Sequence, residues 1–167
     1  DVVQHLKARF PDQILAIKDS SGDWSNMQAL MGIDGLHVYP GSERNLPEAL
    51  AQNAPGCISA SANINAKAIA DTIKAVRQGQ HQQAKTYHAA NCRLRSILEQ
   101  FAMIPFQKQL FATITGDQRW CHLLPPLEAL DETRFLEGRA LLAHEFPHLP
   151  PDPIGDLIAF PKLDRAQ

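Results

Sequence analysis

Cysteines are scarce in this sequence and show no pairing pattern. The three cysteines, Cys57, Cys92 and Cys121, are widely separated, and they form neither a CxxC pair nor a spacing typical of metal ligands. Cys57 and Cys92 fall in apolar runs, so we expect both to be small packing residues. Free thiols of this kind fit a reducing compartment.

An excess of charge of one sign is also lacking. The 167 residues carry a formal net charge of -2, with a pI near 6.4. Bulk electrostatics therefore attracts neither nucleic acid nor anionic membranes. No apolar stretch approaches the roughly 20 residues that span a bilayer, and the first residues lack the pattern of a signal peptide. We expect a cytoplasmic protein whose partners include neither nucleic acid nor a membrane.

Motifs of several enzyme and binding classes are missing. The sequence contains no HExxH, no glycine-rich phosphate loop and no arguable Ser-His-Asp order. His144 and His148 have the spacing of a metal-binding pair, but Pro147 lies between them at a predicted helix end, so we expect no metal there. Trp24 and Trp120 are expected to be packing residues, because no basic groove surrounds them.

Three short apolar runs stand out, and each is followed by a polar loop. They cover residues 14–18, 36–39 and 57–61. Short apolar runs without polar alternation predict buried strands. Helices are predicted over residues 1–10, 45–52, 81–101, 105–114 and 131–146, from Asp23 or Ser25 to Gly32, and from Asn63 or Asn65 to Gln78. Strands alternating with helices predict an α/β fold with a parallel sheet, whose loops converge at its carboxyl-terminal edge.

Lys18 closes the first apolar run, at the carboxyl end of the predicted strand. Folds of the α/β class place their chemistry there, and a partly desolvated lysine amine is the usual Schiff-base nucleophile. A free lysine has a pKa of about 10.4, and packing of its stem lowers that pKa. Judged without its neighbours, a strand-end lysine is more often a surface or ion-paired group. Strand alternation predicts that the adjacent Asp19 points to the other face or caps the loop.

Three strands are few for a complete fold of this kind. A closed (β/α)8 barrel takes about 250 residues and eight strands, whereas an open three-stranded sheet leaves two unpaired edges. The sequence also begins within a predicted helix that no strand precedes. We therefore expect the chain to be the end part of a larger fold.

Three motifs surround the predicted strands: ILAIKDSSGD (14–23), YPGSE (39–43) and GCISASAN (56–63). In this order they resemble the dihydrodipicolinate synthase / N-acetylneuraminate lyase family of (β/α)8-barrel class I aldolases, and their spacing is similar to that of its barrel strands six, seven and eight. IPFQK (104–108) and PPL (125–127) resemble the family's carboxyl-terminal helical region. The resemblance implies a partial barrel over residues 1–79, a helical region over 80–146 and a proline-rich tail over 147–167.

The resemblance implies that Lys18 forms a Schiff base with the keto carbon of pyruvate or a related 2-oxo acid. Loss of a proton then gives an enamine that attacks an aldehyde, or the reverse reaction cleaves a carbon–carbon bond. By the same analogy, the peptide carbonyl of Ile58 and the Gly41 region lie near the bound keto acid. The lysine itself is the electron sink, so no metal or organic cofactor is expected, and family members usually assemble as homodimers or tetramers.

Other polar residues in the motifs have a functional and a structural interpretation. Asp23 is expected to cap a helix rather than to act as a catalytic acid. Glu43 either faces the pocket and helps to select the aldehyde, or is a solvated loop carboxylate. Ser59 and Ser61 either line the mouth of the pocket or satisfy packing.

One departure from the family is large. Its GTTG-type carboxylate-binding loop and its proton-relaying tyrosine have no counterpart here, since neither Tyr39 nor Tyr87 lies in the tyrosine motif. We expect a pyruvate-dependent aldolase or lyase represented by its carboxyl-terminal part. The residues after Lys18 also leave a sugar-acid aldolase or dehydratase of the same family open. Two further alternatives are a truncated, non-catalytic remnant that binds a keto acid or a partner, and a fragment of an intact enzyme.

Overall fold

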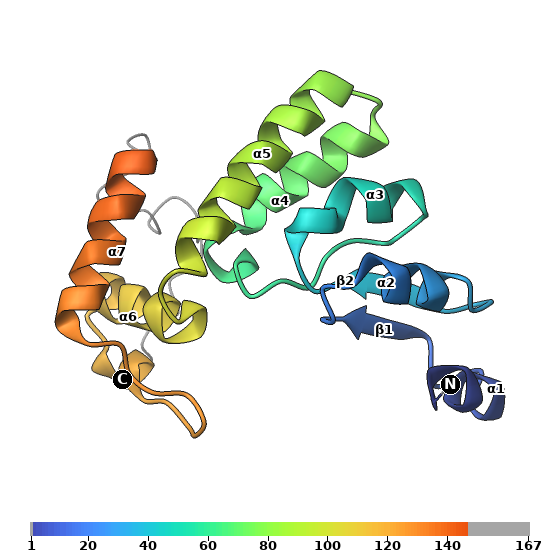
Figure 1. Ribbon diagram of the computed structural model, residues 1–167, viewed down its shortest axis with the longest axis horizontal. Coiled ribbons are helices and arrows are strands. Elements are labelled where there is room, and N and C mark those ends of the chain that lie inside the picture. Colours follow the sequence, from blue (N-terminus) through green and yellow to red (C-terminus); the bar gives the residue numbers. More distant parts are fainter. Residues whose placement is uncertain (1, 147–167) are drawn as a thin grey trace, which may run out of the picture. The chain divides into compact units, whose positions relative to one another are not determined.

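The computed structural model describes residues 2–146 (Figure 1). The predicted proline-rich tail and His148 lie outside the described residues. The described chain divides into two compact units, one made of residues 2–62 and 67–92 and the other of residues 63–66 and 93–146.

The first unit is built on a two-stranded parallel sheet. β1 (Ala16–Asp19) and β2 (His37–Pro40) run side by side, with Lys18 opposite Tyr39 in the register (Figure 1). The predicted α/β arrangement with parallel strands is confirmed for this pair.

Helices cover one face of this sheet. α1 (Val2–Arg9) precedes β1, and α2 (Trp24–Met31) supplies the crossover that a parallel pair requires. Met27 and Leu30 of α2 are three residues apart, so they share the helix face that is buried. The buried core of the unit consists of Met27, Leu30, Leu36, Val38, Ala49 and Ala54.

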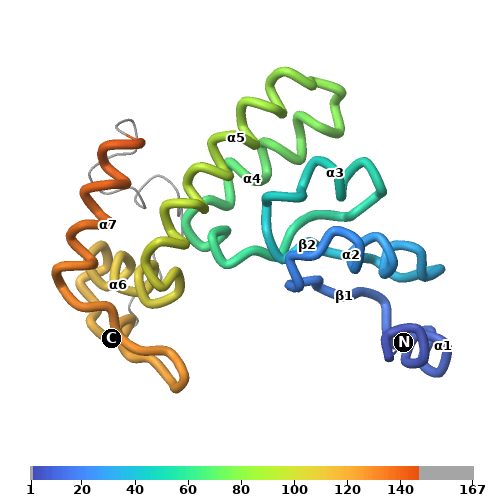
Figure 2. The backbone as a smooth tube through the Cα atoms, in the orientation of Figure 1, coloured from blue at the N-terminus to red at the C-terminus, as the bar shows by residue number. Residues whose placement is uncertain are grey.

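The third predicted strand, residues 57–61, does not form. The chain from the end of α3 (Leu46–Ala51) to α4 (Ala62–Arg77) is irregular (Figure 2), and Ile58 N donates a hydrogen bond to Pro40 O at 3.0 Å. A strand ladder needs repeated backbone bonds, and Pro40 has no N–H to donate in return. The prediction of a strand over residues 57–61 was therefore wrong, although this segment is bonded to the end of β2.

The helices that follow differ from the prediction mainly at their ends. The short 3-10 turn η1 (Glu43–Asn45) leads into α3, and Pro47 lies in the first turn of α3, where proline is tolerated. The N-cap position of α4 is occupied by Ser61, whereas the sequence predicted Asn63 or Asn65 at the start of this helix. Asn65 instead lies inside α4 and interrupts it, with a φ of -135° and a ψ of 21°. α5 (His81–Leu98) follows after a short turn.

α4 and α5 are joined by polar contacts in the first unit. Asn91 Nδ2 donates to Thr72 Oγ1 at 2.9 Å, and both side chains are buried. Thr72 Oγ1 in turn donates to Ala68 O at 2.9 Å. No helix in residues 2–146 is both long and apolar enough to span a membrane.

The second unit is helical. It contains α6 (Met103–Thr115), the 3-10 turn η2 (Gln118–Cys121) and α7 (Glu132–Glu145). A Cβ atom at Gly138 of α7 would lie 2.5 Å from Cε2 of Phe106, so α6 and α7 approach closely there. The buried core consists of Ile64, Leu94, Ile97, Leu98, Phe101, Phe106, Leu110, Phe111, Phe135 and Leu142.

Candidate active site

Lys18 lies at the carboxyl end of β1, on the strand face turned away from the helices. Side chains alternate between faces along a strand, and paired residues of neighbouring strands share a face. Val38 and Pro40 are buried, which identifies their face as the covered one. Lys18 and its partner Tyr39 therefore lie on the opposite face.

The sequence led us to expect that the side chain of Lys18 is packed and partly desolvated, but the structure does not show this packing. Lys18 is exposed, and Tyr39 beside it is partly buried. β1 pairs only with β2 among the described strands, so Lys18 lies on an edge strand and its side chain is open to solvent. The expected desolvation of Lys18 is therefore not seen in the described residues.

The loop after β1 is organised by its own carboxylates. Asp19 is 5% exposed, and its Oδ1 accepts hydrogen bonds from Ser21 N at 2.9 Å and Asn26 Nδ2 at 3.3 Å. Asp23 Oδ1 accepts from Ser25 N at 2.8 Å and caps α2. The prediction that Asp19 points to the other face or caps the loop is confirmed, as is the prediction that Asp23 caps a helix.

Gly41 follows β2 directly and lies close to the end of β1. Gly41 N donates to Asp19 O at 2.7 Å, and a Cβ atom at position 41 would lie 2.7 Å from both Asp19 O and Ser20 Oγ. Close backbone approach therefore accounts for a glycine at this position. Whether Gly41 also lines a substrate pocket stays a prediction.

Ile58 lies beside the end of β2. Its N–H is bonded to Pro40 O, as described above, and 47% of the residue is exposed. Ile58 and Lys18 are thus attached to the same short sheet, Lys18 through β1 and Ile58 through its bond to β2. The assignment of the Ile58 carbonyl to a bound keto acid stays a prediction.

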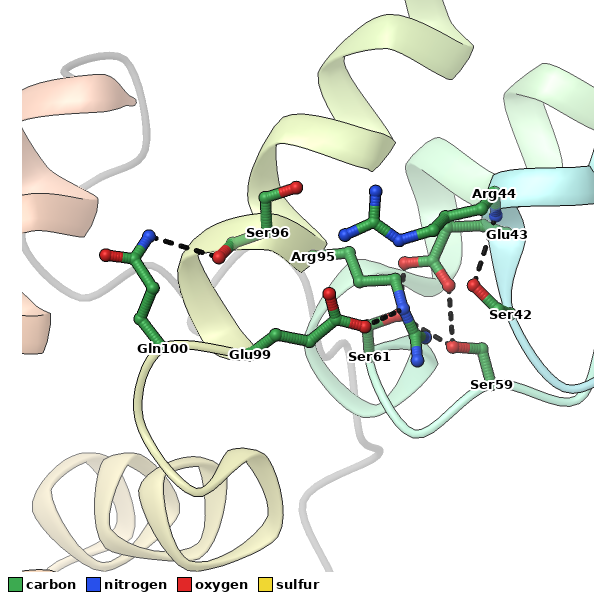
Figure 3. Close-up of polar contacts among 9 residues, drawn as sticks. All are labelled: Ser42, Glu43, Arg44, Ser59, Ser61, Arg95, Ser96, Glu99 and Gln100. Atoms are coloured by element: carbon green, nitrogen blue, oxygen red, sulfur yellow. Dashed lines mark hydrogen bonds and ion pairs between the residues drawn. The ribbon is translucent and has the colours of Figure 1, made fainter. Parts of the chain in front are cut away.

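Glu43 forms a buried polar cluster with Ser59 and Ser61 (Figure 3). Glu43 is 0% exposed, Ser59 Oγ donates to its Oε2 at 2.6 Å, and Ser61 Oγ donates to its Oε1. The two serine oxygens lie 2.8 Å apart. The solvated-carboxylate interpretation of Glu43 is therefore wrong, and both serines are buried hydrogen-bonding residues.

His88 of α5 completes this cluster and was not identified from the sequence. His88 Nε2 lies 3.0 Å from both Glu43 O and Arg44 O. Carbonyl oxygens only accept hydrogen bonds, so His88 is assigned the tautomer that carries its proton on Nε2. Cys92 Sγ lies 3.3 Å from the same nitrogen. No local signal predicts a contact between residues 44 or 45 positions apart.

Residues considered for other kinds of site take structural roles. Trp24 packs against the core of the first unit, and Trp120 stacks on Phe111 with ring centroids 4.9 Å apart. Both are packing residues, as predicted. His144 is exposed and lies 3.2 Å from Glu145 Oε1. Over residues 2–146, no group of three or more His, Cys, Asp or Glu side chains is placed to hold a metal ion.

Known proteins are similar to this chain in sequence and in fold. A family model described as the dihydrodipicolinate synthetase family matches residues 1–145. An uncharacterised DapA-like lyase of Chloroflexus aurantiacus is 33% identical over 79 residues, which are 47% of this chain and 26% of that protein. The 4-hydroxy-tetrahydrodipicolinate synthase of Novosphingobium aromaticivorans is 40% identical over 74 residues, or 42% of this chain and 25% of that protein.

Solved structures of other proteins are similar to this chain in fold. YagE, a prophage protein of the dihydrodipicolinic acid synthase family from E. coli K12, was crystallised in complex with pyruvate. It matches with a TM-score of 0.70 and 24% identity, over 86% of this chain and 50% of its own. Dihydrodipicolinate synthase from Thermotoga maritima matches with a TM-score of 0.69 and 16% identity, over 87% of this chain and 51% of its own.

The matches cover only part of each relative. The chain spans about a quarter of the curated relatives and about half of the solved structures. Its α/β arrangement with few strands is consistent with a partial barrel. Because the family model covers residues 1–145 of the 167, the chain belongs to the dihydrodipicolinate synthetase family.

Proposed function

We propose that the protein is a pyruvate-dependent class I aldolase or lyase in which Lys18 is the Schiff-base nucleophile. The position of Lys18 carries this proposal: it is the residue before the last one of β1, on the strand face turned away from the helices, where (β/α)8 enzymes place their catalytic groups. The pyruvate complex of the structurally similar YagE supports a 2-oxo acid as the substrate class.

The proposed chemistry begins with attack of Lys18 Nζ on the keto carbon of the 2-oxo acid. Water leaves, and a C=N bond joins the lysine nitrogen to that carbon. The imine withdraws electrons, so a proton departs from the neighbouring methyl carbon and an enamine forms. The enamine carbon attacks an aldehyde carbonyl, or the reverse sequence breaks that bond, and water finally releases the product from Lys18.

The finer placement in the barrel belongs to the same proposal. We assign β1, β2 and residues 57–61 to the sixth, seventh and eighth strand positions of the barrel. Gly41 and Ile58 then border the keto-acid site next to Lys18. The bond from Ile58 N to Pro40 O supports the eighth position for residues 57–61, because it sets this segment beside β2. A homodimer or tetramer is proposed for the assembled protein, and analytical ultracentrifugation measures it.

The exposure of Lys18 favours a second candidate function, that of a non-catalytic module that binds a keto acid or a partner. An exposed amine keeps its hydration, whereas class I aldolases activate theirs by desolvation. A sugar-acid aldolase or dehydratase would share the imine and differ in the second substrate.

Exchange of the pyruvate methyl protons for deuterium tests the proposal. In D2O, an enamine that forms and reverts replaces these protons, which proton NMR follows as loss of the methyl signal. The 167-residue chain is expected to accelerate the loss above buffer, and Lys18→Arg is expected to abolish the acceleration. A folded chain that binds pyruvate without exchange would support the non-catalytic module, and exchange with a longer 2-oxo sugar acid in place of pyruvate would support the sugar-acid alternative.

A further inference from the structure

We infer that Glu43 is a positioning residue that holds residues 57–61, and with them the Ile58 peptide, against the end of β2. The inference rests on the proposed function insofar as that peptide borders the keto-acid site. Its structural part, the restraint of the segment by Glu43, stands on contacts within the first unit.

The segment is held by backbone bonds that lie outside regular secondary structure. Residues 54–59 form neither helix nor strand, Ile58 N donates to Pro40 O, and Ala62 N donates to Ser59 O at 3.2 Å. Because neither of these two bonds belongs to a strand ladder, side-chain hydrogen bonds add to the restraint of the segment.

Glu43 supplies that restraint through two hydroxyl groups. The Ser59 and Ser61 hydroxyls both donate to its carboxylate, inside a region where Glu43 is 0% and Ser61 is 0% exposed. Ser59 is the residue that follows Ile58, so its nitrogen belongs to the same peptide group as the Ile58 carbonyl. Hydrogen bonds to a carboxylate are stronger than those between neutral groups, and burial strengthens them further.

Glu43 is itself fixed from two directions. It opens the η1 turn, where Ser42 Oγ accepts from Arg44 N at 3.2 Å. His88 Nε2 of α5 donates to the Glu43 and Arg44 carbonyl oxygens. A continuous set of contacts therefore runs from α5 through Glu43 to the peptide at Ile58.

The test compares two substitutions of different severity. Glu43→Leu removes both acceptor oxygens, while Glu43→Gln keeps the shape, and rotation of the serine hydroxyls can restore its hydrogen bonds. Glu48→Leu, an exposed acid on α3, is the matched control. Hydrogen exchange of the Ile58 amide reports the segment directly, and the His37 amide, bonded to Leu15 O at 3.0 Å, is the internal reference.

We expect Ile58 exchange to become about tenfold faster in Glu43→Leu, consistent with the loss of hydrogen bonds to a charged group. Exchange at His37 is expected to stay unchanged, as is exchange at Ile58 in Glu48→Leu. Ile58 exchange in Glu43→Gln is expected to lie between that of the parent and that of Glu43→Leu, because its restored hydrogen bonds join neutral groups. In borohydride trapping of pyruvate on Lys18, Glu43→Leu is expected to raise the half-saturating pyruvate concentration several-fold and leave the rate at saturation unchanged.

Each outcome decides a different claim. Unchanged Ile58 exchange in folded Glu43→Leu would overturn the inference and leave the proposed function standing. Faster Ile58 exchange without any pyruvate adduct in the parent chain would refute the proposed function and keep the restraint by Glu43. Should Glu43→Leu fail to fold, Ser59→Ala takes its place, and Ile58 exchange equal to that of the parent would again overturn the inference.

Discussion

Gly41, the residue after β2, lies against the end of β1, and it has no room for a side chain. A Cβ atom there would lie 2.7 Å from Asp19 O and from Ser20 Oγ. Gly41 is not among the glycines with a positive φ angle, so the restriction is steric rather than conformational. We therefore expect Gly41→Ala to push the strand ends apart.

The expected loss of stability is set by the contact of the added Cβ atom with Asp19 O, because this oxygen cannot move away freely. The Ser20 hydroxyl can rotate, whereas Asp19 O is held by the 2.7 Å hydrogen bond from Gly41 N. An ordinary contact of 3.4 Å requires a shift of about 0.7 Å, which carries that bond past its usual length. Losing the bond costs about 1–3 kcal/mol, and the reduced entropy of the unfolded chain returns about 0.4–1 kcal/mol. The expected net destabilisation is about 1–2 kcal/mol.

Urea unfolding followed by Trp24 fluorescence, in a Trp120→Phe background, measures this loss, because Trp24 packs on the core of the first unit. We expect the midpoint to fall by roughly 0.5–1 M. Gly56→Ala is the matched control: the nearest atom to its Cβ is Tyr39 Cε1 at 3.9 Å, so it should be tolerated. Equal stability of the Gly41 and Gly56 variants would refute the steric argument.

Three further substitutions test the packing and the caps. Gly138→Ala is expected to destabilise the second unit by about 1–2 kcal/mol in urea, since overpacking outweighs the gain in helix propensity; a rise in stability would contradict the close approach of α6 and α7. Asp23→Ala is expected to cost about 1 kcal/mol by removing the cap on Ser25 N, and Asp23→Asn should keep most of it. Thr72→Val is expected to cost about 1 kcal/mol by removing the acceptor of Asn91 Nδ2, and an unchanged melting temperature would argue against the α4–α5 contact.

Elements with signals in their own sequence could be predicted. α2 carries an aspartate cap and the apolar pair Met27 and Leu30 on one face, and both features act as the pattern indicated. The order of β1, α2 and β2 also followed from apolar runs separated by a crossover. These features depend on residues only a few positions apart, which is why the sequence contains enough information to predict them.

The arrangement of the candidate site could be predicted only in part. Lys18 was identified from its place at a strand end, but its exposure depends on which other segments cover the sheet. The cluster of Glu43 with Ser59, and its contact with His88, joins residues 16 and 45 positions apart. The strand predicted at residues 57–61 does not form for a similar reason. A strand ladder depends on the neighbouring strand, here β2, and Pro40 of β2 has no backbone N–H to donate.

The central claim is that Lys18 forms an imine with a 2-oxo acid, and borohydride trapping tests it most directly. Borohydride reduces the C=N bond to a stable secondary amine, and peptide mass spectrometry then locates the pyruvate adduct on the 167-residue chain. Lys67 and Lys74, which are exposed on α4, are internal references for unselective labelling. We predict an adduct at Lys18 that saturates with pyruvate, exceeds labelling of both references and disappears in Lys18→Arg. Equal labelling of all three lysines, or no adduct on a folded chain, would contradict the claim.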